Sequence, residues 1–433
     1  MKSKKLITGF IKFARIPPVC KKYCCCLRFC GESLLCAIQF RHFNVGSYEK
    51  LPLVEGSMAI IEKEFMELTK GLDLEWFWEE NQRSRPLTPD KPRCPISFAP
   101  DDHWLFEFVQ IPSTMRYYQD KTYRDHLHRE VNQITREFIG VTFFDEDTWE
   151  YSPKRIENLF GCEFTYTEGG TPWLTPVTDN PQEFHHILDR AEKTDITQWA
   201  LPEAYRKEWE MRQSQGRSLP LLGTGSRGPA TIMTSVLTAE TVFYWIYDYP
   251  DLIRRFRDIL AVKMVELNQF FRRFSGNTQL GWWITDDNCA LFNRKLYREF
   301  CYPVLEKVLN AMAPDLPGRD PTSRYQHSDS AMGHLLDFQR ELGINIVNYG
   351  PEVDVALIRA KMPDALIKGQ MPPMLLRNGS PDEIRERVIE DFSKAGASGR
   401  LEITTAGSLA AGTGVGRMRW FMQCVQDSAR YKQ

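Results

Sequence analysis

The second half of this chain alternates short apolar runs with long amphipathic segments, and this alternation constrains the fold more than any other feature. Six such pairs follow one another after residue 218. Their apolar runs read LPLLGTGSRGPATIM, LGWWITDD, SRYQHSDS, INIVNYGP, ALIKGQMPP and LEITTAGS. Repeated strand-then-helix units predict a parallel sheet with helices packed outside it.

Two further strands are expected upstream of these six units. One is the apolar run WLFEFVQIP, which begins at Trp104. The other comes from the 160s, where residues 162–178 also alternate and carry turn residues in the manner of a hairpin. Eight strand–helix units close naturally into a (β/α)8 TIM barrel. An open doubly wound sheet is the alternative, but no GxGxxG motif opens a helix, so no nicotinamide or flavin cofactor is expected.

Composition divides the chain into three parts. Residues 1–50 form a basic, cysteine-rich extension that we expect to be disordered, and residues 51–103 form a helical and loop segment in which 55–68 read as an amphipathic helix. Residues 104–433 form the predicted barrel. The extension holds ten Lys and Arg against two Glu although the whole chain has a net charge of −2. The body is therefore acidic, which argues against nucleic acid as a partner.

Six of the eleven cysteines lie within residues 20–36 of the extension. Three interpretations stay open for them: metal binding, attachment to a membrane surface or acylation, and a flexible extension without a function of its own. No apolar stretch approaches eighteen residues, so no transmembrane helix is expected. The body cysteines are scattered singly, which is typical of a reduced compartment and favours a cytoplasmic protein.

The residues that follow the predicted strands are polar, and in a TIM barrel the active site lies at the carboxyl ends of the strands. We predict four catalytic residues, which are Asp286, Asp287, His327 and Asp329. We predict that substrate is bound by Arg227, Asn348, Tyr349, Gln370 and Ser408. Structural alternatives exist, because one aspartate of the adjacent pair could cap a helix and Arg227 could pair with a local carboxylate. Trp282 and Trp283 are expected to pack in the barrel.

Several of these segments together resemble one family. They are LGTGSRGPATIMTSVL, TDD followed by REFCYPVLEKVL, HSDS followed by LGINIVNYGP, IKGQMPPMLLRNGSPDEIRERV and TTAGSLAAGTGVGRMRWFMQCV. They resemble the uroporphyrinogen decarboxylase superfamily, which holds the haem-pathway decarboxylases and the corrinoid-dependent methyltransferases. The resemblance covers roughly residues 104–430. It implies a (β/α)8 barrel with a deep mouth for a tetrapyrrole or a corrinoid-linked substrate, and a homodimer.

The resemblance differs between the two branches of that superfamily. The decarboxylases carry an Arg-Gln-Ala-Gly-Arg segment that binds substrate carboxylates, and this sequence has no such run. The thiol methyltransferases bind zinc through His-x-Cys and a later Cys, which match His327-Ser328-Asp329 and Ser408, so both thiols are missing here. Similarity to the O-demethylating methyltransferases implies a thiol-poor zinc site, with His327 and Glu306 as ligands beside Asp286 or Asp287.

The leading hypothesis is therefore methyl transfer between a small-molecule substrate and a corrinoid cofactor carried by a partner protein. The alternative is decarboxylation of a porphyrinogen or another carboxylated substrate. A third hypothesis is a non-catalytic protein that binds a tetrapyrrole or corrinoid.

Overall fold

A six-stranded parallel sheet forms the centre of the carboxyl-terminal half, in the spatial order β10-β9-β8-β7-β6-β5. Its strands are β5 (Gly225–Arg227), β6 (Trp282–Thr285), β7 (Arg324–Ser328), β8 (Ile346–Tyr349), β9 (Leu366–Lys368) and β10 (Leu401–Glu402). Each strand comes from one of the six apolar runs, so the predicted parallel α/β arrangement is confirmed. The computed structural model describes residues 48–52, 58–318 and 320–432. All of them belong to the compact unit Gly46–Gln433.

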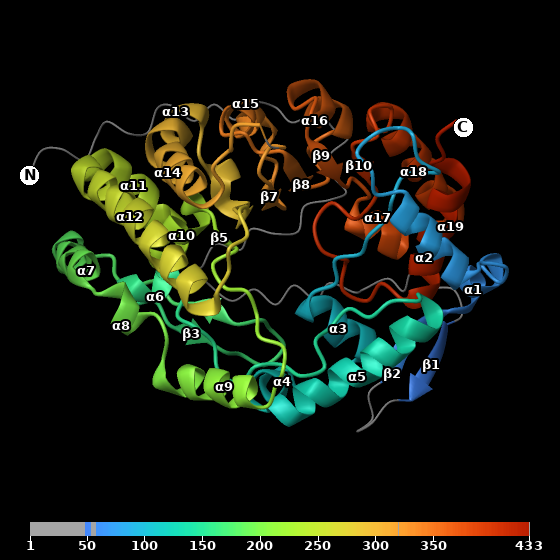
Figure 1. Ribbon diagram of the computed structural model, residues 1–433, viewed down its shortest axis with the longest axis horizontal. Helices are drawn as coiled ribbons and strands as arrows, with labels where there is room; N and C mark the ends of the chain where they lie inside the picture. Colours follow the sequence, from blue (N-terminus) through green and yellow to red (C-terminus); the bar gives the residue numbers. More distant parts are fainter. Residues whose placement is uncertain (1–47, 53–57, 319, 433) are drawn as a thin grey trace, which may run out of the picture. The chain divides into compact units, whose positions relative to one another are not determined.

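Helices follow every strand of this sheet, and Figure 1 shows α12, α14, α15 and α16 ranged along one side of it. The helices after the strands are α10 (Pro229–Val236), α11 (Ala239–Asp248), α12 (Pro250–Ser275), α13 (Arg294–Leu296), α14 (Tyr302–Met312), α15 (Leu336–Glu341), α16 (Val355–Lys361), α17 (Pro373–Asn378), α18 (Pro381–Ala395) and α19 (Val415–Ser428). Three short turns of other helix types are η3 (Asp287–Leu291), η4 (Tyr297–Cys301) and η5 (Gly333–Leu335).

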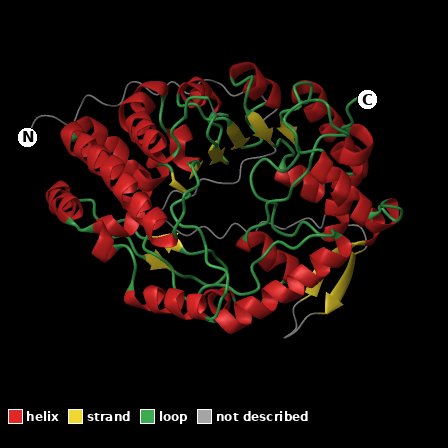
Figure 2. Cartoon of the chain, viewed as in Figure 1, coloured by secondary structure: helices red, strands yellow, loops and turns green. Residues whose placement is uncertain are grey.

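The first half of the described chain is mainly helical, as Figure 2 shows. Its helices are α1 (Lys63–Leu68), α2 (Leu74–Arg83), α3 (Asp102–Val109), α4 (Thr114–Gln119), α5 (Lys121–Phe138), α6 (Ile156–Phe160), α7 (Pro181–Lys193), α8 (Ile196–Trp199) and α9 (Glu203–Ser214). Two antiparallel pairs join them, β1 (Tyr48–Pro52) with β2 (Met58–Glu62) and β3 (Phe164–Thr165) with β4 (Trp173–Leu174). The helix expected over 55–68 is found only in its second half, as α1, because the part before it is the strand β2, and residues 55–57 lie outside the described residues.

The strand predicted from Trp104 is wrong, because this segment is the helix α3. Asp101 caps the helix by accepting a hydrogen bond from the Trp104 N–H at 2.9 Å. The helix buries five of its eight residues, and a helix that is apolar on most sides shows no periodicity that separates it from a buried strand.

The strand expected from the 160s is also absent from the described sheet. Residues 162–178 form the hairpin of β3 and β4, as their turn residues indicate, and these strands pair only with each other in the described chain.

At the β10 edge of the sheet, the chain near Ile96 lies parallel to the chain after β10. Ser97 N–H donates to Ile403 O at 3.2 Å, and Ile403 N–H donates to Pro95 O at 2.8 Å. Eight paired strands are not found among the described residues.

No helix in the described ranges is long and apolar enough to cross a membrane. The predicted extension, residues 1–50, lies outside the described residues apart from the first three residues of β1.

Candidate functional site

The two faces of the parallel sheet differ sharply in burial. Paired residues of neighbouring parallel strands lie on the same face, and successive residues alternate between faces. One face is buried against the helices and carries Trp282, Ile284, Gln326, Ser328, Val347, Tyr349, Ile367 and Leu401. The other face is partly exposed and mostly polar, and it carries Arg227, Trp283, Thr285, Tyr325, His327, Ile346, Leu366, Lys368 and Glu402.

A row of register partners crosses the accessible face at the carboxyl ends of four strands. Arg227 pairs with Thr285, Thr285 with His327, and His327 with Asn348. Three of these four residues, Arg227, His327 and Asn348, are predicted from the sequence to be functional. The pairing of the strands alone therefore places these side chains next to one another.

The imidazole of His327 is held by Asn348, and this contact fixes which ring nitrogen carries a proton. Asn348 Nδ2 donates to the backbone oxygens of Lys368 at 2.5 Å and Thr405 at 3.0 Å, and its Oδ1 accepts the Gly407 N–H at 3.2 Å. His327 Nδ1 lies 2.7 Å from that same Oδ1. Because the amide oxygen can only accept, Nδ1 must donate, and in the neutral imidazole Nε2 then carries the lone pair.

Two carboxylates face the Nε2 atom of His327. Nε2 lies 3.3 Å from Asp329 Oδ1 and 3.9 Å from Asp287 Oδ1. The Asp329 N–H donates to Asp287 Oδ1 at 2.9 Å, which ties the two acidic residues together. Burial works to lower the pKa of His327, but the hydrogen bond and charge of Asp329 and the charge of Asp287 outweigh it, and the net pKa is raised.

Asp287, His327 and Asp329 form a candidate metal site, since one ligand atom from each residue lies within 4.8 Å of the others. Zinc accepts nitrogen and carboxylate oxygen ligands at about 2.0–2.2 Å, which places two tetrahedral ligands roughly 3.3–3.6 Å apart. The distances of 3.3 and 3.9 Å from Nε2 to the two carboxylates fall at or near that spacing. The donor set therefore fits zinc.

Asp286 does not join this group although it is adjacent to Asp287. Its side chain is fully buried, and Oδ1 accepts the Thr231 N–H in the first turn of α10 at 2.8 Å. A Cβ atom at Gly228 would lie 2.3 Å from Asp286 Cγ, so the carboxyl group is packed directly against that glycine. Burial raises the pKa of Asp286 to about 7. The residue predicted to be catalytic thus lies inside the helical layer and holds α10.

Glu306 was predicted as the second metal ligand, and the structure does not place it with His327. It is exposed on α14, in the layer of helices outside the sheet. The carboxylates beside His327 are those of Asp287 and Asp329 instead. A metal bound here would use these two and not Glu306.

Of the five predicted substrate-binding residues, Asn348 is buried and holds His327, and the other four separate into two groups. Tyr349 is fully buried and donates its hydroxyl to Gln326 Oε1 at 3.1 Å, and buried Gln370 donates to Gly350 O and Val353 O. These two support the backbone around the site. Arg227 and Ser408 are partly exposed, as a substrate contact requires.

Arg227 also has the local carboxylate partner that was the alternative interpretation. Its Nη1 lies 3.0 Å from Oε1 of buried Glu157 in α6. The side chain of Arg227 remains 30% exposed, so it can meet a ligand while it is paired.

Sequence reasoning missed two features of the accessible face. Trp282 packs in the core as predicted, but Trp283 is 40% exposed. Its ring lies flat over Gly225, where a Cβ atom would come within 2.1 Å of it. Lys368 and Glu402 form an ion pair of 3.1 Å on the same face. Alternation of polar and buried residues within each strand is the signal that could have found them.

Comparison with known proteins agrees with this arrangement. Residues 156–427 match the family model described as uroporphyrinogen decarboxylase (URO-D), which is more than half of the chain. A solved structure described as a methyltransferase from Methanosarcina mazei has a similar fold, with a TM-score of 0.53 and 14% sequence identity over 80% of this chain and 98% of that one. No curated protein is similar enough in sequence to match.

Proposed function

Because this chain belongs to the uroporphyrinogen decarboxylase family, we propose that it is an enzyme that transfers a methyl group between a small substrate and a corrinoid held by a partner protein. The observation that carries the proposal is the group of Asp287, His327 and Asp329 at the carboxyl ends of β6 and β7. The fold of the methyltransferase from Methanosarcina mazei is consistent with it. The missing Arg-Gln-Ala-Gly-Arg segment speaks against a substrate with many carboxylates.

His327, Asp287 and Asp329 would hold the zinc ion. When bound, the metal supplies Lewis-acid polarisation of a substrate heteroatom, and the corrinoid supplies the other partner of the methyl transfer. Asn348 keeps the His327 ring in one orientation and one tautomer, so that Nε2 offers its lone pair to the site. Outer partners of this kind raise the basicity of a ligand and restrict its motion.

The accessible face provides the surface for the substrate. Trp283 presents an aromatic ring, Arg227 a partly exposed cation, and Ser408 a hydroxyl near the end of β10. An aromatic floor with a few polar groups at its rim is typical of small-molecule sites. These residues would bind and orient the substrate beside His327.

We also propose that the sheet belongs to a (β/α)8 barrel, as the family implies. The chain near Ile96 already extends the sheet beyond β10 in the parallel direction. That segment would take the place of the strand that was predicted at Trp104.

The test combines metal analysis with a methyl-exchange assay. Purified protein should contain one zinc per chain, and it should convert methylcobalamin when supplied with a series of small methyl acceptors. His327→Ala should lose both properties. His334→Ala is the matched control, because the His334 ring lies 2.9 Å from the Phe292 backbone oxygen and is not part of the group. The proposal is refuted if the unchanged protein contains no zinc and shows no methyl exchange.

Incubation with uroporphyrinogen distinguishes the decarboxylase alternative. Release of carbon dioxide with formation of products that have fewer carboxyl groups would assign the chain to that activity. Tight corrinoid binding without turnover, unaffected by His327→Ala, would assign it to a binding protein.

A further inference from the structure

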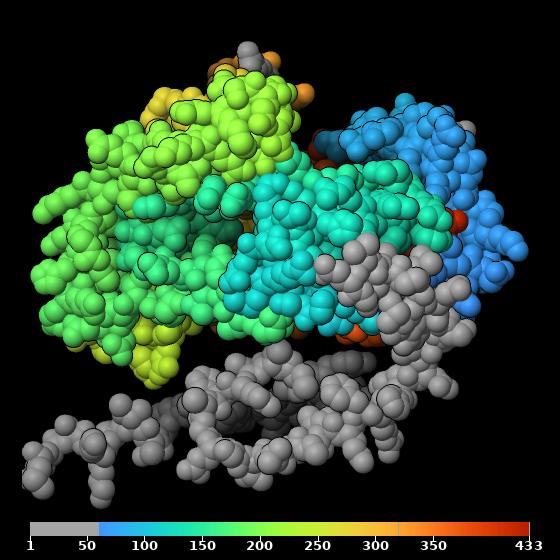
Figure 3. Space-filling view, turned by 90° about the horizontal axis from the view of Figure 1, so that it is seen from below, coloured from blue at the N-terminus to red at the C-terminus, as the bar shows by residue number. Residues whose placement is uncertain are grey.

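A cavity of about 560 Å³ lies between helices α3 and α4 on one side and the segment from Ser152 to the β3–β4 hairpin on the other. Figure 3 shows the surface hollowed between the cyan and green parts of the chain. None of the three residues of the His327 group lines the cavity. Its volume falls within the range of about 300–1,000 Å³ that is usual for small-molecule sites.

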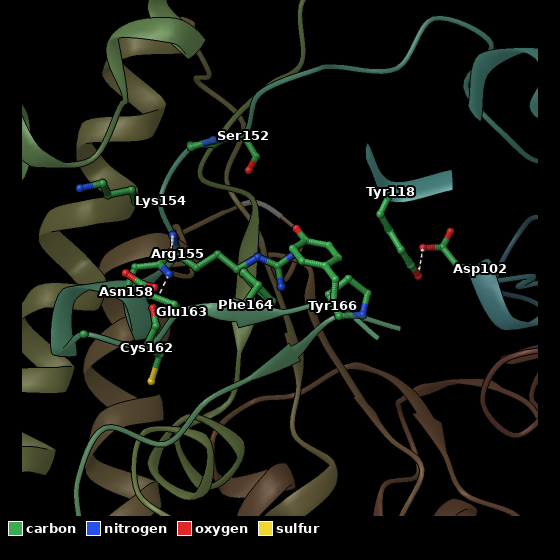
Figure 4. Close-up of a pocket in the computed structure, with 13 residues that line it drawn as sticks. Asp102, Tyr118, Ser152, Lys154, Arg155, Asn158, Cys162, Glu163, Phe164 and Tyr166 are labelled. Carbon is green, nitrogen blue, oxygen red and sulfur yellow. Dashed lines mark hydrogen bonds between the residues drawn. The ribbon is translucent and has the colours of Figure 1, made fainter. Parts of the chain in front are cut away.

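The side chain of Arg155 reaches into this cavity. The Arg155 guanidinium lies 4.9 Å from the centre of the Phe164 ring, and Figure 4 shows the side chain extending toward Tyr166. In the part of the chain that the structure describes, no carboxylate forms an ion pair with Arg155. A guanidinium stacked on a ring keeps its in-plane N–H donors free, and these donors match a carboxylate in bidentate geometry.

The neighbouring cation, Lys154, also lines the cavity, but its ammonium is engaged elsewhere. Its ammonium lies 4.9 Å over the Trp199 ring, and Figure 4 shows the side chain directed away from Arg155 and Tyr166. Two adjacent residues of equal charge thus point to different surroundings. This difference provides an internal control for any charge effect.

Each side of the cavity contributes an aromatic ring to the lining, Tyr118 from α4 and Tyr166 from the hairpin. The rings of Tyr118 and Tyr166 lie 5.7 Å apart at an angle of 53°. The Tyr118 hydroxyl donates to Asp102 Oδ2 at 3.2 Å, and the Tyr117 hydroxyl donates to Oδ1 of the same residue at 2.9 Å. Burial and the charge of Asp102 raise the pKa of Tyr118. Its hydroxyl therefore stays protonated and continues to donate a hydrogen bond to the Asp102 carboxylate.

We infer that this cavity is a second ligand site that binds a small aromatic carboxylate, with the carboxylate on Arg155 and the ring against Tyr118 and Tyr166. The ring pair offers faces and edges for an aromatic ligand. The remaining carboxylate of the wall, Glu163, forms no side-chain hydrogen bond or ion pair with a described residue. It would oppose an anionic ligand and would favour a cationic one.

The Glu157–Arg227 ion pair connects the segment that carries Arg155 to the accessible face of the sheet. Glu157, two residues after Arg155, holds Arg227 at 3.0 Å. The inference nevertheless does not depend on methyl transfer, because binding is measured on metal-free protein without a corrinoid.

The test is calorimetric titration of the full chain with benzoate. Arg155→Met should weaken binding by roughly 10- to 150-fold, which corresponds to the loss of hydrogen bonds to a charged group worth about 1.5–3 kcal/mol. Lys154→Met should leave the affinity within twofold. Glu163→Gln should leave it unchanged or strengthen it, and cyclohexanecarboxylate should bind more weakly than benzoate.

Four results would overturn the inference: no saturable benzoate binding at millimolar concentration, equal losses in Arg155→Met and Lys154→Met, weaker binding in Glu163→Gln, or cyclohexanecarboxylate binding as tightly as benzoate. If Arg155→Met does not fold, Arg155→Lys serves in its place. The lysine keeps the charge but loses the bidentate geometry, so a loss of several-fold is expected, and an unchanged affinity would count against the site.

Discussion

Substitution of Asn348 tests whether an outer partner sets the metal-binding nitrogen of His327. Asn348 Oδ1 accepts from His327 Nδ1 at 2.7 Å and from the Gly407 N–H, while Nδ2 donates to two backbone oxygens. In Asn348→Ala the imidazole loses this acceptor and can rotate or change tautomer. The proton can then occupy Nε2, the nitrogen that faces Asp329 and Asp287.

Loss of an outer partner of a metal ligand typically weakens metal affinity 10- to 100-fold. This corresponds to about 1.4–2.7 kcal/mol in the free energy of zinc binding. The assay is competition for zinc with a chromophoric chelator at pH 7.5, with thermal unfolding of the metal-free protein recorded in parallel. The Asn348→Ala variant should bind zinc more weakly by that factor.

Asn345→Ala is the matched control, because Asn345 directly precedes β8, at the end of the strand away from the site. Asn345 Oδ1 accepts the Arg324 N–H at 2.9 Å, and its Nδ2 donates to Thr322 O at 2.9 Å. The control should lower the unfolding temperature without a change in zinc affinity. Equal zinc affinity in Asn348→Ala and the unchanged protein would refute the tautomer argument, as would an equal loss in both variants.

Three further predictions concern stability. Gly228→Ala places a Cβ atom 2.3 Å from Asp286 Cγ and should destabilise the fold by about 1–3 kcal/mol in chemical unfolding. Burial raises the pKa of Asp286 from 3.8 to about 7. The stabilisation that its protonated carboxyl gives the folded state is therefore complete below pH 3.8 and is lost as the pH rises toward 7. Asp286→Asn in metal-free protein should abolish that part of the decline. Burial acts to raise the pKa of Glu80, but Arg430 and Arg93 outweigh it and hold the pKa below 4.5. The stabilisation by the ionised carboxylate is therefore lost in acid, and Glu80→Gln should make the free energy of unfolding depend less on pH below that value.

The alternation after residue 218 was enough to predict the parallel half of the fold. Each apolar run there is bounded by turn residues and followed by a long amphipathic segment, so strand and helix are distinguished by length as well as by pattern. The apolar run at Trp104 shows no such difference in length and pattern between a strand and a helix. Asp101 stands at the N-cap position, and weight given to this capping signal would have predicted the helix α3 from the sequence.

Glu306 shows a different limit of sequence reasoning. The family resemblance implies it as a zinc ligand, but the sequence does not determine how its helix is turned against the sheet. The structure exposes it on α14, while the carboxylates beside His327 come from the ends of β6 and β7 themselves. Residue type can indicate a metal, but only the strand ends are constrained to converge on one place.

The strand ends could have been sorted further by parity. In β6 the buried residues are Trp282 and Ile284, and continued alternation places Asp286 on the buried face and Asp287 on the accessible one. The backbone supports this continuation, because the Asp286 N–H still donates to His327 O at 3.0 Å. The same rule in β8 places Val347 and Tyr349 on the buried face and Asn348 on the face of His327, with which it pairs. Position at a strand end selects the candidates, and the side of the pleat decides which of them support the helices and which face a ligand.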